Sequence, residues 1–163
     1  MILLTGFEPF GDRGFNPSFA IARQAAAILV DRGVEAVAAQ LPCVFATAPA
    51  QLDALLERYN PSVVIGLGLA AGRATMALEK VAINHIDARI VDNAGAQPID
   101  VPVWRDGPNA YFSTLPLKAA VQALREPAQD REAIDVNISY TAGSFVCNQM
   151  FYSLMHRLER TPG

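Results

Sequence analysis

The sequence contains no long hydrophobic run. Its longest apolar stretch, residues 63–71, is nine residues long, whereas a helix that crosses a membrane needs about 20. The N-terminus has no basic segment ahead of its apolar residues, and the acidic Glu8 follows soon after them. We therefore expect a first β-strand there rather than a signal peptide. Neither feature predicts a membrane protein.

Blocks of basic residues are also missing, and cysteine is scarce. The 13 Lys and Arg residues are spread among 16 Asp and Glu, for a net charge of −3, so nucleic acid is not an expected partner. Only Cys43 and Cys147 carry thiols, and they form no CxxC pair. We expect both to be reduced thiols in a cytoplasmic protein.

The chain of 163 residues is 52% hydrophobic, enough for one compact domain over residues 1–163. Apolar alternation, continuous apolar runs, helix caps and breakers predict its elements. The segment 88–112 is rich in Gly, Pro, Asn and Asp and is expected to be mostly loop. We expect strands at 1–5, 34–40, 62–68, 75–84 and 134–140, and helices at 17–33, 47–59, 115–126 and 146–160, with Asn16 and Thr47 as N-caps.

Strands that alternate with helices predict an α/β fold: an open, mostly parallel twisted sheet with helices on both faces. The apolar run at 62–68 is typical of a central parallel strand. Ligands bind such sheets beyond the carboxyl ends of the strands. Three conspicuous loops are expected at that edge, at residues 6–16, 68–73 and 141–147.

The segment GLGLAA, residues 66–71, matches the G-x-G-x-x-G/A pattern of dinucleotide sites. Asp87 follows at the distance of a ribose-binding acid. That pattern also requires a helix at the glycines. The residues from Thr75 to Ile83 instead alternate with a period of two, which predicts a strand. We interpret the glycines as a tight loop, and a nucleotide-binding domain stays the third hypothesis.

Cys147 follows the turn AGSFV, where a strand is expected to pass into a helix. Unpaired amides and the helix dipole there stabilise a thiolate, and the preceding amides suit an oxyanion. The competing interpretation is an inert buried thiol, which is the commoner fate of a lone cysteine. Cys43, within LPCVF, has no such surroundings and is expected in the core.

Glu79 stands in an otherwise apolar extended segment, next to Leu78 and before Val81. Local features favour an edge strand that turns Glu79 towards water. The alternative is a carboxylate that orients a histidine, as the third member of a catalytic triad does.

Six motifs in order resemble the pyroglutamyl-peptidase I family and cover nearly the whole chain: LLTGFEPFG, NPS, GLAAGR, LEKVAINHIDARIVDNAGAQPID, AYFSTLP and TAGSFVCNQMFY. The resemblance implies a cytoplasmic thiol protease with an α/β/α fold and no cofactor or metal, frequently a homotetramer. Such a hydrolase removes an N-terminal pyroglutamyl residue from peptides through a thiolate nucleophile and an acyl-enzyme.

Residue by residue, the resemblance makes Cys147 the nucleophile, Glu79 the triad carboxylate and Arg89 an arginine near the oxyanion. A lactam ring is flat, neutral and largely apolar, so it suits aromatic walls, whereas a charged N-terminal amine would be rejected there. Leu69 departs from the glutamine of some members. The residues that match the pyroglutamate pocket are Phe7, Phe10, Asn16, Leu69, Ile90, Phe145 and Val146.

The family's catalytic histidine lies after its last helix, and this chain ends sixteen residues past Cys147. The C-terminal part of the fold, with the base, is therefore expected to be missing. His156 would lie ~13 Å along the same helix on its opposite face, and His85 ~20 Å beyond Glu79 on a straight strand. Neither is expected to be the base. The alternative function is a pyroglutamyl-binding protein without turnover.

Overall fold

The computed structural model describes residues 1–12, 14–129 and 131–160. Contacts group the chain into two compact units. Unit 1 consists of Met1–Leu69 and Asp87–Asp100, and unit 2 consists of Ala70–Ile86 and Val101–Gly163.

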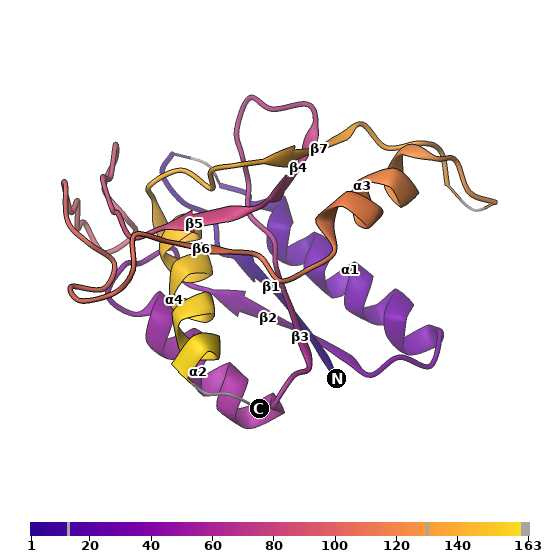
Figure 1. The fold of residues 1–163 in the computed structure, drawn as a ribbon, viewed down its shortest axis with the longest axis horizontal. Coiled ribbons are helices and arrows are strands. Elements are labelled where there is room, and N and C mark those ends of the chain that lie inside the picture. The colour runs from indigo at the N-terminus through magenta and orange to yellow at the C-terminus, as the bar shows by residue number, and fades with distance from the viewer. Residues whose placement is uncertain (13, 130, 161–163) are drawn as a thin grey trace. The chain divides into compact units, whose positions relative to one another are not determined.

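Unit 1 alternates strands and helices, and its three strands form a parallel sheet. The sheet order is β2-β1-β3, so β1 is its central strand and β3 lies at its edge. The expectation of a central position for the third strand is therefore wrong within this sheet. The elements are β1 (Ile2–Phe7), α1 (Pro17–Asp31), β2 (Ala36–Leu41), α2 (Ala48–Tyr59) and β3 (Val63–Gly66) (Figure 1).

Both faces of the unit 1 sheet are covered by helices. Leu3 and Leu4 are successive residues of β1, so their side chains point to opposite faces, and both are buried. Leu4 packs against Ala22 and Ala26 of α1. In Figure 1, α1 and α2 lie on either side of the three strands. This arrangement confirms the expected α/β architecture for this unit.

The helix boundaries follow the predicted caps in part. Asn16 has an extended backbone and accepts a hydrogen bond from Ser18 N, so it caps α1 as expected, and α1 ends just before Gly33, whose φ is +77°. Thr47 occupies the N-cap position of α2 as predicted, but its side chain makes no cap hydrogen bond. Asn60 ends α2 in the left-handed conformation.

Unit 2 contains two strand pairs and two helices. The β4–β7 pair is parallel and the β5–β6 pair is antiparallel. α4 packs against β5 and β6 through a buried cluster of Ala82, Tyr111, Tyr152 and Met155. The elements are β4 (Met76–Glu79), β5 (Val81–Ile83), β6 (Ala110–Phe112), α3 (Leu117–Arg125), β7 (Val136–Ser139) and α4 (Val146–Arg160).

The predicted strand at 75–84 is two strands, because the chain changes partner at Lys80. Its N–H donates to Ser139 O of β7, whereas its carbonyl accepts from Ser113 N, just after β6. The same pairing explains β6, which lies within a segment expected to be loop. No helix among the described residues is long and apolar enough to cross a membrane.

Gly6 allows α1 to approach β1 closely. A Cβ at Gly6 would clash with backbone atoms of Ser18 and Phe19, whereas a Cβ at Gly66 would meet only Thr5 Oγ1 at an ordinary 3.6 Å. Because the obstructing atoms are backbone, the helix itself would have to move. Ser18 Oγ also accepts the N–H of Phe7, so that hydrogen bond would be strained as well.

We expect Gly6→Ala to lower the free energy of unfolding by about 1–3 kcal/mol, the usual cost of overpacking. Gly66→Ala, in the same sheet, is the matched control and should cost much less. Urea denaturation followed by circular dichroism measures both. Equal stability of the two variants would contradict the close approach of α1 to β1.

Candidate active site

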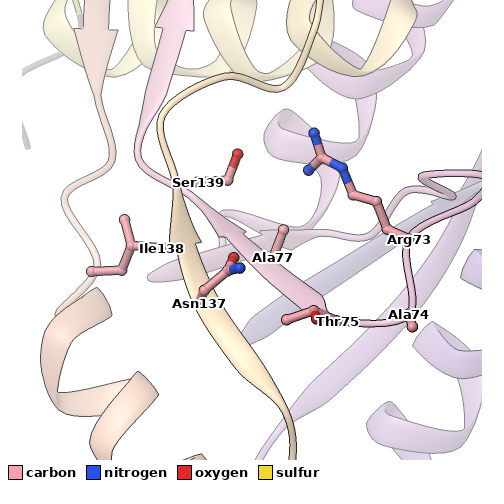
Figure 2. Close-up of a pocket in the computed structure, with 7 residues that line it drawn as sticks. All are labelled: Arg73, Ala74, Thr75, Ala77, Asn137, Ile138 and Ser139. Atoms are coloured by element: carbon pink, nitrogen blue, oxygen red, sulfur yellow. The ribbon is translucent and has the colours of Figure 1, made fainter.

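The C-terminal ends of β4 and β7 carry polar side chains on one face of their ladder. Thr75, Ala77 and Glu79 alternate along one strand, and the register places Asn137 opposite Ala77 and Ser139 opposite Glu79. An open cavity of about 380 Å³ lies on this face, and Figure 2 shows Arg73 reaching over it from the loop before β4. It is lined by Arg73, Ala74, Thr75, Ala77, Asn137, Ile138 and Ser139.

Glu79 is held at the end of β4 with its two carboxylate oxygens in different surroundings. Oε1 lies 3.6 Å from Arg73 Nη1, and the Glu79 side chain is 26% exposed. Oε2 is buried and has no hydrogen-bond partner among the described residues. Glu79 therefore faces water only in part. A buried oxygen without a donor costs about 1–3 kcal/mol, which marks Oε2 as the acceptor for a further donor.

Cys147 is the second residue of α4 and is half-buried. A tight loop returns the chain from β7 to α4: Gly143 has a φ of +78°, and its N–H donates to Thr141 Oγ1 at 3.0 Å. The first helical hydrogen bond runs from Gln149 N to Phe145 O. Cys147 thus lies in the first turn, as the sequence predicts.

The Cys147 thiol is nevertheless protonated at neutral pH. Burial is the largest cause that raises its pKa, and the negative charge of Glu79 adds to the effect. A backbone hydrogen bond opposes both, and the resulting pKa is about 11. The expectation that the helix start yields a thiolate is not met in this chain, because desolvation outweighs the local amides. Glu79 thus lies near enough to Cys147 for its negative charge to raise the pKa of the thiol.

The two histidines occupy different places. His156 Nδ1 lies 2.8 Å from Tyr111 Oη, which itself donates to Glu159 Oε2 at 2.7 Å, so Nδ1 carries the proton in that bond. The imidazole packs 4.7 Å from the Trp104 ring. His156 is therefore part of an aromatic cluster, as expected for a residue that is not the base.

His85 lies two residues beyond β5, and its backbone carbonyl accepts from Asn148 Nδ2. The chain changes pairing partner at Lys80, so Glu79 and His85 follow different ladders rather than one continuous strand.

Sequence reasoning missed two polar residues of unit 2. Arg73 ends the GLAAGR motif and contacts Glu79, yet its role depends on a contact that spacing does not reveal. Asn148 directly follows Cys147 and is completely buried. A signal for it existed, since it shares the spacing i, i+4, i+7 with the buried Tyr152 and Met155.

The remaining candidates divide between the units. Phe145 and Val146 precede Cys147 in unit 2, and Val146 is buried. Unit 1 contains Phe7, Phe10, Asn16, Leu69, Arg89 and Ile90.

Within unit 1, the loop after β1 is tied to the segment that carries Arg89 and Ile90. Asn93 Nδ2 donates to Glu8 Oε1 at 2.7 Å and to Pro9 O at 2.8 Å. Glu8 Oε1 also accepts from the N–H of Cys43, which is buried as expected.

Phe7 is buried, and Asn16 uses its side chain to bond Ser18 N and Glu8 O. Asn16 thus has a structural function at this loop whatever else it contacts.

One competing interpretation, the nucleotide-binding domain, loses support. The glycines at 66–71 lead into β4 rather than a helix, so the dinucleotide fingerprint is wrong. Within residues 1–12, 14–129 and 131–160, no group of three or more His, Cys, Asp or Glu side chains could hold a metal ion. The chemistry available in unit 2 is a thiol, a carboxylate and an arginine.

A half-buried thiol at a helix start, near a carboxylate in an α/β fold, is an arrangement that suits a cysteine-dependent hydrolase. The comparison with known proteins is more specific. The model of the family described as pyroglutamyl peptidase matches residues 1–162. The chain belongs to this family.

Curated relatives are similar in sequence to this chain over almost its whole length. A pyrrolidone-carboxylate peptidase of Cupriavidus taiwanensis is 52% identical over 99% of this chain and 72% of its own length. One from Pseudomonas fluorescens is 49% identical over 99% of this chain and 73% of its own.

Solved structures of two enzymes also have a fold similar to that of this chain. Pyroglutamyl Peptidase I of Bacillus amyloliquefaciens has a TM-score of 0.89 at 39% identity, over 98% of this chain and 74% of that one. A mutant pyrrolidone carboxyl peptidase of Pyrococcus furiosus has a TM-score of 0.91 at 38% identity, over 98% and 74%. The fold and the enzyme class inferred from the sequence are confirmed.

We expect alkylation of Cys147 by iodoacetamide to accelerate about tenfold per pH unit up to a midpoint near pH 11, because only the thiolate reacts. Glu79→Gln removes the negative charge that raises the pKa, so its midpoint should fall and its rate at pH 8 should rise. Mass spectrometry of the alkylated peptide measures both. Identical profiles with and without the carboxylate would contradict the action of Glu79 on the thiol.

Proposed function

We propose that residues 1–163 form one peptidase domain that recognises an N-terminal pyroglutamyl residue and cleaves the bond after it. Cys147 is the nucleophile and Glu79 the carboxylate of the triad. The observation that carries this proposal is the charge of Glu79 acting on Cys147, together with a buried Oε2 that has no hydrogen-bond partner among the described residues.

The reaction would proceed through an acyl-enzyme. The Cys147 sulfur adds to the pyroglutamyl carbonyl carbon, the C–N bond to the next residue breaks, and the leaving amine takes the proton lost by the thiol. Water then cleaves the thioester, releasing pyroglutamate and restoring the thiol. With a thiol pKa of about 11, a base is needed to carry the proton at neutral pH.

That base, we infer, is a histidine outside these 163 residues. A neutral imidazole that donates one N–H to Glu79 Oε2 would satisfy the buried oxygen and turn its other nitrogen to the thiol. The resemblance to the family supports the same assignment. Arg73 fits this arrangement, since its guanidinium pairs with Oε1 and not with Oε2, the oxygen assigned to the histidine.

The assignments in substrate binding rest on the family resemblance and on residue chemistry. Apolar side chains suit the flat, neutral lactam ring, and we assign this role to Phe7, Phe10, Leu69, Ile90, Phe145 and Val146. Arg89 is assigned to the oxyanion and Asn16 to the substrate pocket. The substrates would be peptides with a pyroglutamyl N-terminus, acted on in the cytoplasm by a homotetramer.

The second candidate function is pyroglutamyl binding without turnover by this chain. The raised pKa of Cys147 and the bond from His156 to Tyr111 favour it. The two candidates share ligand recognition and differ only in catalysis, so separate experiments test the two properties.

Recognition is tested with a pyroglutamyl chloromethyl ketone, whose methylene carbon forms a thioether with Cys147 as chloride leaves. We expect it to modify Cys147 faster than the prolyl analogue, whose ring carries a charged amine in place of the neutral lactam. Cys43→Ser should leave labelling intact and Cys147→Ser should abolish it. Equal rates for the two reagents would reject pyroglutamyl recognition, and loss of labelling in Cys43→Ser would reject the nucleophile.

Catalysis is tested with a chromogenic pyroglutamyl amide. We expect this chain to turn over at least ~10³-fold more slowly than a version extended with the C-terminal segment of a relative, because members of a nucleophile–base unit act together. Turnover within tenfold of the extended chain would mean that a base lies inside this sequence. His85→Ala and His156→Ala would then identify it.

A further inference from the structure

α4 is attached to the β5–β6 ribbon by one face of the helix. Asn148, Tyr152 and Met155 are all buried on α4 at the spacing i, i+4, i+7. Tyr152 and Met155 join the apolar cluster with Ala82 and Tyr111. Asn148 differs from them, because it is polar, has no exposed surface and lies in the same first turn as Cys147.

The carboxamide of Asn148 completes the free edge of β5. Its Oδ1 accepts from Ile83 N, and its Nδ2 donates to Ile83 O and to His85 O, each at 2.9 Å. The alternate residue, Asn84, directs its N–H to Asn109 O on the side of β6. The Asn148 side chain therefore satisfies backbone groups that a neighbouring strand would otherwise bond. These hydrogen bonds come from a single position of the helix.

These three hydrogen bonds connect the chain segment that carries Glu79 to the helix turn that carries Cys147. Ile83 lies four residues after Glu79, and Asn148 is bonded covalently to Cys147. Between Glu79 and Ile83 the backbone is fixed by the bonds of Lys80 to Ser139 O and from Ser113 N. The position and rotation of the first turn of α4 are thus set relative to the strand end that carries the carboxylate.

We propose that Asn148 is a positioning residue that sets the separation and orientation of the Cys147 thiol relative to the Glu79 carboxylate. Its importance for turnover rests on the proposed function. A helix rises about 1.5 Å and rotates about 100° per residue, so a small slide or rotation of the first turn moves the sulfur appreciably. A misplacement of about 1 Å can reduce a rate about 10²-fold.

A purely structural role would satisfy the β5 edge without influencing Cys147. Asn84 provides the matched control. Its side chain also makes three hydrogen bonds to backbone, with Trp104 N, Trp104 O and Gly107 O, and it belongs to the same unit. Its bonds hold the loop after Val101 rather than the first turn of α4.

The test compares the pH profile of Cys147 alkylation by iodoacetamide in the unaltered chain, in Asn148→Ala and in Asn84→Ala. Glu79 is the charged group that raises the thiol pKa, after burial itself. We expect Asn148→Ala to lower the midpoint by about one pH unit or more, which means at least about tenfold faster labelling at pH 8. Asn84→Ala should keep the parent midpoint.

Folding is checked in the same samples. Buried Cys43 should stay unlabelled in a folded variant, and near-ultraviolet circular dichroism should retain the signal of the Tyr111–Tyr152 cluster. An unchanged midpoint in folded Asn148→Ala, or an equal shift in Asn84→Ala, would overturn the proposal. If Asn148→Ala does not fold, Asn148→Ser, which keeps an acceptor for Ile83 N–H, replaces it with the same expected direction.

A measurement on the unaltered chain covers the case in which neither variant folds. In sub-denaturing urea, hydrogen exchange of the Ile83 amide and the acceleration of Cys147 labelling above its rate without urea should show the same opening free energy and urea dependence. A urea-induced acceleration of labelling without opening at Ile83 would overturn the proposal. Neither experiment uses turnover, so an extended chain that shows the expected profiles but does not cleave the pyroglutamyl amide would count against the proposed function alone.

Discussion

The proximity of one carboxylate to one thiol is the constraint on which the proposed chemistry of unit 2 depends. The negative charge of Glu79 raises the pKa of the Cys147 thiol, and both side chains are largely removed from water. Such a pair disfavours ionisation of the thiol, because a second negative charge nearby is costly in a medium of low dielectric. A group that accepts the thiol proton and also donates to the carboxylate would reverse this penalty, which is the logic of a triad.

The surrounding backbone keeps this pair in place at the ends of two parallel strands. Glu79 ends β4 opposite Ser139, which ends β7, and the loop with a left-handed Gly143 brings the chain back into α4. Lys80 then passes the chain from the β7 ladder to the β6 ladder. Each of these features constrains either the carboxylate or the thiol, so the local geometry is over-determined by hydrogen bonds.

Unit 1 uses a buried Asp92 and a half-buried Glu8 to hold loops rather than to react. Asp92 accepts from the N–H groups of Phe45, Ala94 and Ala96, and Glu8 accepts from Cys43 N and from the side chain of Asn93. Charge-assisted hydrogen bonds of this kind are among the stronger ones. The bonds of Glu8 and Asn93 order the loop after β1, and those of Asp92 order residues 92–96 and tie them to Phe45.

The sequence alone determined features that depend on neighbours in the chain. Apolar periodicity located the four helices and most strands, Asn16-Pro17 gave the start of α1, and the long motifs gave the family. Local sequence patterns did not predict the features that depend on a pairing partner far away in the chain. These features are the change of ladder at Lys80, the short strand β6 and the edge position of β3. Pairing is a non-local property, so propensity cannot assign it.

Only the tertiary structure decided the chemistry of the site. A helix N-terminus favours a thiolate, yet the Cys147 pKa rises because the fold buries the thiol and brings Glu79 close. Arg73 and Asn148 gain their importance from contacts with Glu79 and with Ile83, 65 residues before Asn148 in the chain. Desolvation and charge act through space, so their balance at a residue is fixed by what the fold packs around it, not by its neighbours in sequence.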